Sequence, residues 1–178
     1  ECYIDEVTRR RVAYVEDPAT TDHINRAAKW LTGKHKTGLM LSGTVGNGKT
    51  TLMKAIRSLI GILYGGHSYS ERKGVVLVSA LELADMARDN PEQFRNIKNS
   101  ELLAIDDVGV EPALVKTWGN EISPFVDLIY HRYDRQLFTL VTSNLNPEDL
   151  EKRYGARIAD RFTEMFDRIA FENKTYRK

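Results

Sequence analysis

The feature that most constrains the fold of this chain is the eight-residue stretch 43–50, which reads GTVGNGKT. Two glycines five positions apart, followed by a lysine and a hydroxyl residue, form the pattern of a phosphate-binding loop. The glycines let successive backbone N–H groups turn toward a phosphate, and the N-terminus of the following helix adds partial positive charge. The alternative is an ordinary glycine-rich turn, but such a turn has no need of Lys49 and Thr50 at this spacing.

The residue types of this loop indicate ATP and Mg²⁺ as the cofactors. The ammonium group of Lys49 would reach the β- and γ-phosphates, and the hydroxyl of Thr50 would bind Mg²⁺. We expect nine successive residues to bind the nucleotide: Gly43, Thr44, Val45, Gly46, Asn47, Gly48, Lys49, Thr50 and Thr51.

A second, independent pattern is the apolar run 102–105, which ends in two carboxylates, Asp106 and Asp107. Buried strands accept acidic side chains only at their ends, and parallel sheets bind ligands at the carboxyl ends of their strands. We predict that Asp106 holds Mg²⁺ and that Asp107 orients or deprotonates the attacking water. The alternative is an exposed Asp-Asp turn, which is less favoured because the same chain also carries the phosphate-loop pattern.

Asn144 follows the run 137–143, at the tip of the fourth predicted strand, and is predicted at the same edge of the sheet. Its amide could hydrogen-bond the γ-phosphate or the water. An asparagine before Asn-Pro forms a turn just as often, so the residue pattern alone leaves both readings open.

Short apolar runs alternate with helical periodicity along most of the chain. Strands are predicted at 38–42, 74–78, 102–105, 137–141 and 169–171. Helices are predicted from Asp22 to about Thr32, from Lys49, through 81–87, from Ser123-Pro124, from Pro147 and near Gly155. Strands that are apolar on both faces and separated by helices predict a parallel sheet in a three-layer α/β/α domain.

Composition excludes several classes of protein. The 178 residues include a single cysteine, Cys2, so no internal disulfide forms, and the four histidines lack the paired spacing of a zinc site. No apolar run approaches the ~18 residues of a membrane-spanning helix. The net charge of +1 gives no general basic field for nucleic acid. These features favour a reducing, cytoplasmic setting and no membrane partner.

Three further stretches follow the phosphate loop in order. They are LLAIDDVG at 102–109, YHRYDR at 130–135 followed by TSN at 142–144, and RYGARIADR at 153–161. With them, the sequence from about Asp22 to Lys178 resembles the AAA+ ATPases of the helicase-loader group, the DnaC and DnaI type, and the related IstB transposition helper. The resemblance implies a five-stranded sheet ordered 5-1-4-3-2, with ATP bound between neighbouring subunits of a ring or spiral.

The resemblance also implies roles for residues that spacing alone leaves undecided. Asn144 looks like the first sensor of the nucleotide. Arg161, with Arg157 as second choice, looks like the finger that reaches the γ-phosphate of the neighbouring subunit, although two arginines four apart also form an ordinary solvated or ion-paired helix face. The Tyr176-Arg177 pair resembles the second sensor, but a terminal basic residue is more often simply exposed.

Two departures from the family pattern affect the expected activity. Asp107 stands where most of the family has Glu, and the shorter side chain predicts slow hydrolysis, with Glu111 as the next carboxylate to consider as base. The chain also stops soon after the fifth predicted strand, so the helical lid is expected to be reduced or absent.

We therefore expect residues 21–178 to form an ATP-binding AAA+ domain. Residues 1–20, which include three successive arginines at 9–11, are expected to be a lead-in with little core of their own, the remnant of a linker to a missing N-terminal domain. By resemblance, the domain hydrolyses ATP, associates with itself through its ATP interfaces, and places a replicative hexameric helicase on single-stranded DNA. The alternatives are a transposition helper ATPase and a nucleotide-dependent scaffold that does not hydrolyse ATP.

Overall fold

The computed structural model describes residues 1–64, 74–117, 120–173 and 175–176. Its centre is a sheet of five parallel strands: β1 (Gly38–Gly43), β2 (Val76–Ser79), β3 (Leu102–Val108), β6 (Phe138–Ser143) and β7 (Phe166–Phe171). They lie in the order β2-β3-β6-β1-β7. Numbered along the chain as the five strands of this sheet, and read from β7, that order is 5-1-4-3-2, as the resemblance implied.

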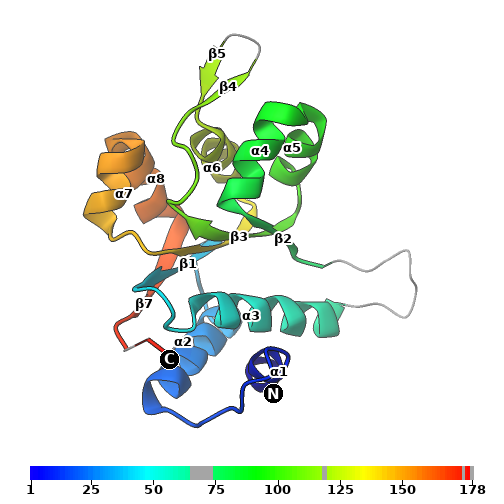
Figure 1. Cartoon of the computed structure of the whole chain (residues 1–178), viewed down its shortest axis with the longest axis vertical. Coiled ribbons are helices and arrows are strands. Elements are labelled where there is room, and N and C mark those ends of the chain that lie inside the picture. Colours follow the sequence, from blue (N-terminus) through cyan, green and yellow to red (C-terminus); the bar gives the residue numbers. More distant parts are fainter. Residues whose placement is uncertain (65–73, 118–119, 174, 177–178) are drawn as a thin grey trace.

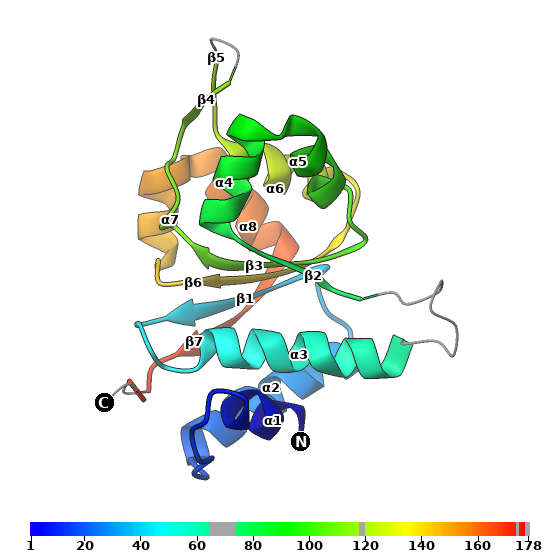
Figure 2. The ribbon, with the colours of Figure 1, turned by 45° about the vertical axis from the view of Figure 1, so that its right-hand side comes forward.

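Helices cover both faces of the sheet and complete the three layers (Figures 1 and 2). On one face lie α1 (Cys2–Thr8), α2 (Pro18–Thr32) and α3 (Lys49–Tyr64). On the other lie α4 (Ala80–Asp89), α5 (Pro91–Lys98), α6 (Pro124–Asp134), α7 (Pro147–Tyr154) and α8 (Ala156–Met165). The expected three-layer α/β/α class is confirmed.

Alternation along the strands divides the core into two apolar clusters. In β1, Leu39 and Leu41 belong to the cluster with α1, α2 and α3, whereas Met40 between them belongs to the cluster with α4, α6 and α8. Successive side chains of a strand point to opposite faces, so one buried strand supplies both clusters. This is why the strands read as continuous apolar runs in the sequence.

The starts of the helices follow their capping residues. Helix α2 begins at Pro18 rather than at the predicted Asp22, because the side chain of Asp17 accepts a hydrogen bond from the N–H of Thr20 at 3.0 Å and proline occupies the first turn. The prediction missed this cap. Ser79 and Glu82 form a capping box at the start of α4.

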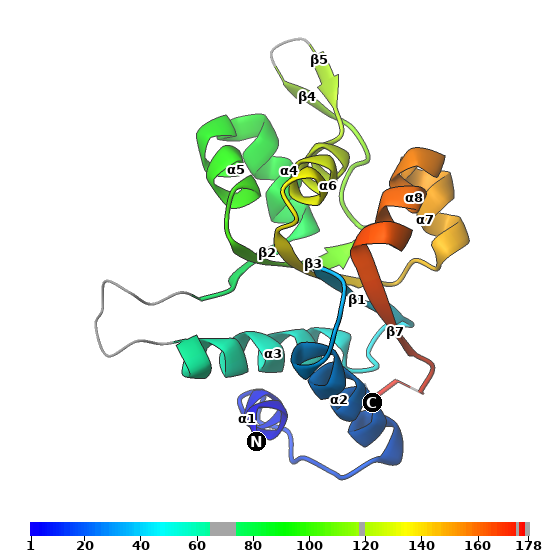
Figure 3. The same ribbon diagram turned by 180° about the vertical axis from the view of Figure 1, so that it is seen from behind.

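The N-terminal segment differs from the sequence-based expectation. Helix α1 packs against α3, and Tyr3 is buried with only 9% of its surface exposed. Residues 2–8 therefore contribute to the core on the α3 side. Figure 3, the view from behind, shows the last described residues close to the start of α2, on the same side of the sheet as α1.

Two elements were not anticipated from the sequence. Helix α5 follows α4 directly, and a two-stranded antiparallel hairpin, β4 (Val115–Thr117) and β5 (Asn120–Ile122), projects from the domain between β3 and α6 (Figure 1). Among the described residues no helix is long and apolar enough to cross a membrane, and no three His, Cys, Asp or Glu side chains gather as a metal cluster.

Candidate nucleotide-binding site

The predicted phosphate loop joins the end of β1 to the start of α3. Gly43, Gly46 and Gly48 adopt φ angles of 146°, 80° and 101°, a region that residues with a side chain rarely occupy. At Gly43 a Cβ atom would also lie 2.2 Å from the carbonyl oxygen of Phe171 on β7. Glycine at this position therefore permits both the turn of the loop and the close approach of β7.

Lys49 lies in the centre of the loop and is buried, with 5% of its surface exposed. Its ammonium group donates to the carbonyl oxygens of Gly43 and Thr44, at 2.8 and 2.6 Å. It also donates to the side-chain oxygens of Asn47, at 3.2 Å, and Asn144, at 2.8 Å. The loop thus holds a cation at the N-terminus of α3, where a phosphate group would be bound.

Contacts from distant parts of the chain support the loop from outside. The buried side chain of Asn47 donates to the carbonyl oxygen of Phe171 at 2.9 Å. The N–H of Tyr176 donates to the carbonyl oxygen of Gly46 at 2.9 Å, and the Tyr3 hydroxyl lies against Gly48. Sequence reasoning missed Tyr3 and Asn47 as supports, because no local pattern pairs Asn47 with β7 or Tyr3 with the loop.

The remaining loop residues divide by exposure. Thr44 and Val45 are exposed at the tip, whereas Thr51 is buried in the first turn of α3. The tip is therefore open to a ligand while the base of the loop is fixed in the core.

The two acids at the end of β3 lie in different environments. Asp106 is half-buried, and its Oδ1 accepts hydrogen bonds from the hydroxyls of Thr50, at 2.9 Å, and Thr142, at 2.6 Å. Asp107 is exposed, has a φ of 57°, and donates its backbone N–H to the Thr142 hydroxyl at 2.9 Å. The structure thus joins the acid pair to both the phosphate loop and β6.

The residues present fit a magnesium ion. Mg²⁺ prefers hard oxygen ligands, and it is commonly held in nucleotide sites by one or two protein oxygens together with phosphates. The hydroxyl of Thr50 and the carboxylate of Asp106 are already within hydrogen-bond distance, beside the Lys49 ammonium that would meet the phosphates. These two side chains supply such a ligand set at the open end of the loop.

Asn144 and Asn146 divide the two roles that the sequence left open for Asn144. The side-chain oxygen of Asn144 accepts the hydrogen bond from Lys49, so Asn144 faces the phosphate loop. Asn146 provides the cap of α7 instead, since its side-chain oxygen accepts from the N–H of Asp149 at 2.8 Å. Asn144 therefore lies beside the Lys49 ammonium, and the turn-forming role belongs to Asn146.

Glu111 is occupied by structural contacts and does not point to a catalytic base. It is 2% exposed, and its carboxylate accepts from the N–H of Gly109 at 2.8 Å and from the hydroxyl of Tyr154. Burial, together with the Glu111 carboxylate, raises the pKa of the Tyr154 hydroxyl. The carboxylate therefore fixes the turn after β3 against α7.

The two candidate arginines lie on α8, across the sheet from α3 (Figure 2). The Arg161 guanidinium lies 4.3 Å from the centroid of the Tyr133 ring and 3.6 Å from the Glu164 carboxylate. Arg157 is exposed. Both border a pocket of about 480 Å³. In the described part of the chain, neither donates a hydrogen bond to the phosphate loop, and the structure does not bring them to their own site.

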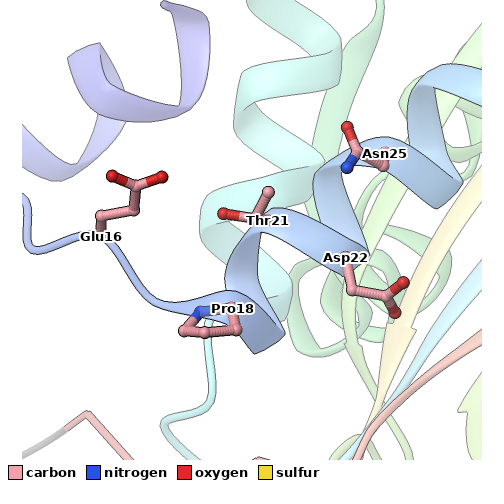
Figure 4. Close-up of a pocket in the computed structure, with 5 residues that line it drawn as sticks. All are labelled: Glu16, Pro18, Thr21, Asp22 and Asn25. Carbon is pink, nitrogen blue, oxygen red and sulfur yellow. The ribbon is translucent and has the colours of Figure 1, made fainter.

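A second hollow, of about 580 Å³, lies along α2 and is lined by Glu16, Pro18, Thr21, Asp22 and Asn25 (Figure 4). Two of these five side chains are carboxylates, which repel a phosphate. The hollow therefore does not compete with the glycine loop as a nucleotide site.

Arg177, the other half of the pair that resembles the second sensor, lies outside the described residues.

Comparison with known proteins gives matches in structure alone. No family model and no curated protein sequence matches this chain. The five-stranded parallel sheet and the glycine loop before α3 together have the form of a phosphate-loop nucleotide-binding domain. Among solved structures, the DnaC helicase loader superimposes with a TM-score of 0.66 at 19% identity, covering 89% of this chain and 93% of that one. DnaI matches with a TM-score of 0.66 at 22% identity, covering 93% and 88%.

A third match extends the set beyond these two. The replication initiator DnaA bound to AMPPCP and single-stranded DNA gives a TM-score of 0.59 at 20% identity, covering 90% of this chain but 48% of that one. At such identities the likeness concerns the fold. The chain therefore has the AAA+ fold of the DnaC and DnaI type, as its sequence motifs implied.

Proposed function

We propose that this chain binds and hydrolyses ATP with Mg²⁺ and acts in loading a replicative hexameric helicase onto single-stranded DNA. The observation that carries the ATPase part is the convergence of three elements at one edge of the sheet. Lys49 on α3 contacts Asn144 beyond β6, and Thr50 on α3 contacts Asp106 on β3. Parallel sheets bind ligands at this edge.

The residues of the loop bind the phosphates. Lys49 exchanges the carbonyl oxygens it now contacts for phosphate oxygens, and the backbone N–H groups of the glycine turns complete the cradle. Thr50 and Asp106 hold Mg²⁺, which when bound neutralises charge on the transferring phosphoryl group. Asn144 stays beside Lys49 and orients the γ-phosphate or the water.

Asp107 is the proposed group that orients or deprotonates the water. Asp107 is exposed, and its φ of 57° departs from the extended backbone of the rest of β3, which supports this role. Aspartate and asparagine tolerate this backbone region better than most residues. The shorter carboxylate still favours slow hydrolysis, and a scaffold that binds ATP without hydrolysing it remains the alternative outcome of the experiments below.

Arg161 is the proposed finger for the site of a neighbouring copy. Because α8 lies across the sheet from α3, an arginine there is better placed to act outward than on its own nucleotide. To do so it must leave the Tyr133 ring and the Glu164 carboxylate. Arg157, one turn earlier and exposed, is the second candidate.

Mixing two inactive variants tests the shared site. Arg161→Ala should keep ATP affinity and lose turnover, because such an arginine typically contributes ~10³ to 10⁵ in rate. Lys49→Ala should lose ATP binding but keep its arginine. Phosphate release should reappear when the two are mixed, at protein concentrations where wild type assembles. Absence of recovery at every mixing ratio would reject Arg161, and the same experiment with Arg157→Ala would then test the second choice.

The helicase and DNA partners are tested separately from the ATPase. The DnaC helicase loader and the DNA-bound DnaA share this fold, which supports a role of this kind in the cytoplasm. The nearly neutral net charge predicts weak binding of single-stranded DNA by the monomer, tighter binding with ATP, and steep loss with salt. Binding that ignores both ATP and salt, or failure of the full-length protein to capture a hexameric helicase, would contradict the loading role.

A further inference from the structure

The pairing of β3 with β6 is irregular at the acid pair. Ile105 pairs with Val141, and the next pair is Val108 with Ser143. Two residues of β3, Asp106 and Asp107, therefore lie opposite a single residue of β6, Thr142. Such a bulge leaves the regular ladder of backbone hydrogen bonds incomplete and redirects the side chains of the bulged strand.

The side chain of Thr142 fills the gap in this ladder. Its hydroxyl donates to Asp106 Oδ1 at 2.6 Å and accepts from the backbone N–H of Asp107 at 2.9 Å. A hydroxyl has one proton and two lone pairs, so both bonds form together. Thr142 is completely buried, so these two partners orient its hydroxyl away from solvent.

The neighbouring Ser143 makes different hydrogen bonds from those of Thr142. Ser143 joins the two strands beyond the bulge, whereas Thr142 contacts the acids within it. The Ser143 hydroxyl donates to the carbonyl oxygen of Val108 at 2.6 Å and accepts from the N–H of Leu145 at 3.0 Å. Ser143 thus ties the strand ends together beyond the bulge. Both bonds of Thr142 go to the acid pair itself.

We propose that Thr142 is a positioning residue for the magnesium site and for Asp107. By holding Oδ1 of Asp106, its hydroxyl fixes the rotation of the carboxylate beside Thr50. By holding the N–H of Asp107, it keeps that residue in its left-handed conformation at the open edge. Both effects come from one hydroxyl on the strand that also leads to Asn144, so β6 aligns the metal ligand and the proposed water-orienting acid together. This inference rests on the proposed function.

The test uses two substitutions at the site and one matched control. Thr142→Val keeps the shape of the side chain and removes the hydroxyl, whereas Thr142→Ser keeps the hydroxyl. Thr139→Val makes the same change on the same strand at an equally buried residue, whose hydroxyl accepts from Arg132 Nε at 2.8 Å at the opposite end. The control therefore reports the general effect of losing a buried hydroxyl from β6.

The first readout is binding of a fluorescent ATP analogue to the full chain, measured with excess Mg²⁺ and with EDTA. Groups that orient metal ligands typically contribute 10- to 100-fold to metal affinity or activity. Thr142→Val should therefore raise the Mg²⁺ concentration for half-maximal tight binding roughly 10-fold or more. Affinity in EDTA should stay unchanged. Thr142→Ser should stay close to wild type, and Thr139→Val should lower the melting temperature without changing the Mg²⁺ dependence.

The outcomes separate this inference from the function beneath it. If wild type gains no affinity from Mg²⁺, the proposed function falls and the role of Thr142 falls with it. If wild type gains affinity and Thr142→Val gains as much, only the role of Thr142 is overturned. A Thr142→Ser variant that folds but loses the Mg²⁺ effect would also overturn it, and this comparison holds even where Thr142→Val is too unstable to measure.

Discussion

The two ends of the β3–β6 strand pair each bury a cation, and they hold it in different ways. At the amino end, Arg132 is completely buried. Its guanidinium donates to Thr139 Oγ1 and to three carbonyl oxygens, those of Lys98, Ser100 and Phe138, at 2.6–3.1 Å. These acceptors belong to α5, to β6 and to the segment before β3, so the arginine joins three parts of the chain.

At the carboxyl end, Lys49 also donates to four oxygens, but these belong to different kinds of structure. Two are carbonyl oxygens of the phosphate loop itself, and two are side-chain oxygens of Asn47 and Asn144. A phosphate can replace such partners without separating elements of the core. The flexible stem and compact ammonium of lysine suit this exchange, whereas the planar fork of arginine suits a fixed set of acceptors.

The difference shows that burial of a charge does not by itself identify a functional residue. Burial lowers the pKa of Arg132 to about 10, and the guanidinium still stays protonated at neutral pH. Its acceptors are satisfied and enclosed, which indicates a structural role. Lys49 is almost as buried but borders the exposed loop tip at Thr44 and Val45.

Lys49→Ala should give the largest functional change at either end. Loss of the ammonium group removes the charge that meets the phosphates, and we expect ATP affinity to fall below the range measurable with a fluorescent analogue. The domain should remain folded, although the loss of the ammonium contacts to the loop carbonyls, Asn47 and Asn144 will loosen the loop. Circular dichroism provides the folding control. Wild-type affinity in this variant would mean that the phosphate-loop assignment is wrong.

Arg132→Met should have the opposite effect, with a loss of fold stability and little change in ATP affinity. The substitution leaves buried carbonyl acceptors without a donor, and such groups typically cost 1–3 kcal/mol each, partly offset because a charge no longer has to be buried. We expect the free energy of unfolding in urea to fall by about 3 kcal/mol. The nucleotide affinity of the folded variant should stay within about threefold of wild type. A large loss of affinity in a stable Arg132→Met protein would break the proposed division between the two ends.

Asp107 gives a smaller and more specific test of the carboxyl end. Asp107→Asn removes the charge but keeps a residue type that tolerates the left-handed backbone conformation. Turnover should therefore fall by about 10²-fold while ATP affinity stays unchanged. Asp107→Glu should raise turnover if the shorter carboxylate holds the water loosely. Phosphate release at saturating ATP measures both. Equal rates in all three proteins would place the base elsewhere, and Glu111 is already engaged by Gly109 and Tyr154.

The smallest expected effect is the pH dependence of stability caused by His23, which packs on Phe171, the residue that contacts Asn47 of the phosphate loop. His23 stacks on Phe171 at 3.9 Å, and burial lowers the pKa of its imidazole. The unfolded chain therefore binds a proton below about pH 6.5 that the folded chain resists. The folded state should therefore keep its full free energy of unfolding above that pH, and this free energy should decrease as the pH falls below it. In His23→Phe this decline should be shallower in thermal melts from pH 7.5 to 5, with His131 contributing the remainder.

Much of the fold could be predicted from the sequence because its signals are local. The apolar runs within β1 (39–41) and β3 (102–105) are continuous, and the breaks between the strands carry glycine, proline or capping residues. The start of α2 was missed although Pro18 after Asp17 is a local signal for a helix start, because Asp22 is also a plausible cap and stands directly before the periodic apolar residues. Helix α1 was missed because seven residues of mixed polarity show too little periodicity to reveal their packing on α3.

The candidate site divides along the same line. The sequence by itself determined which residues form the loop, since Gly43, Gly46, Gly48, Lys49 and Thr50 lie within eight positions of one another and each is needed for its own chemical property. It also placed Asp106 and Asp107 at a strand end, because a buried strand accepts carboxylates only there.

Only the tertiary structure decided how these residues meet. The contact between Thr142 and Asp106 joins residues 36 positions apart, and that between Lys49 and Asn144 joins residues 95 positions apart. Both depend on the order of the strands and on a register shift between β3 and β6 that no local pattern specifies. The roles of Arg132, Thr142 and Glu111 were therefore decided by packing between distant segments, because a side chain acquires its hydrogen-bond partners only when the sheet brings them within about 3 Å.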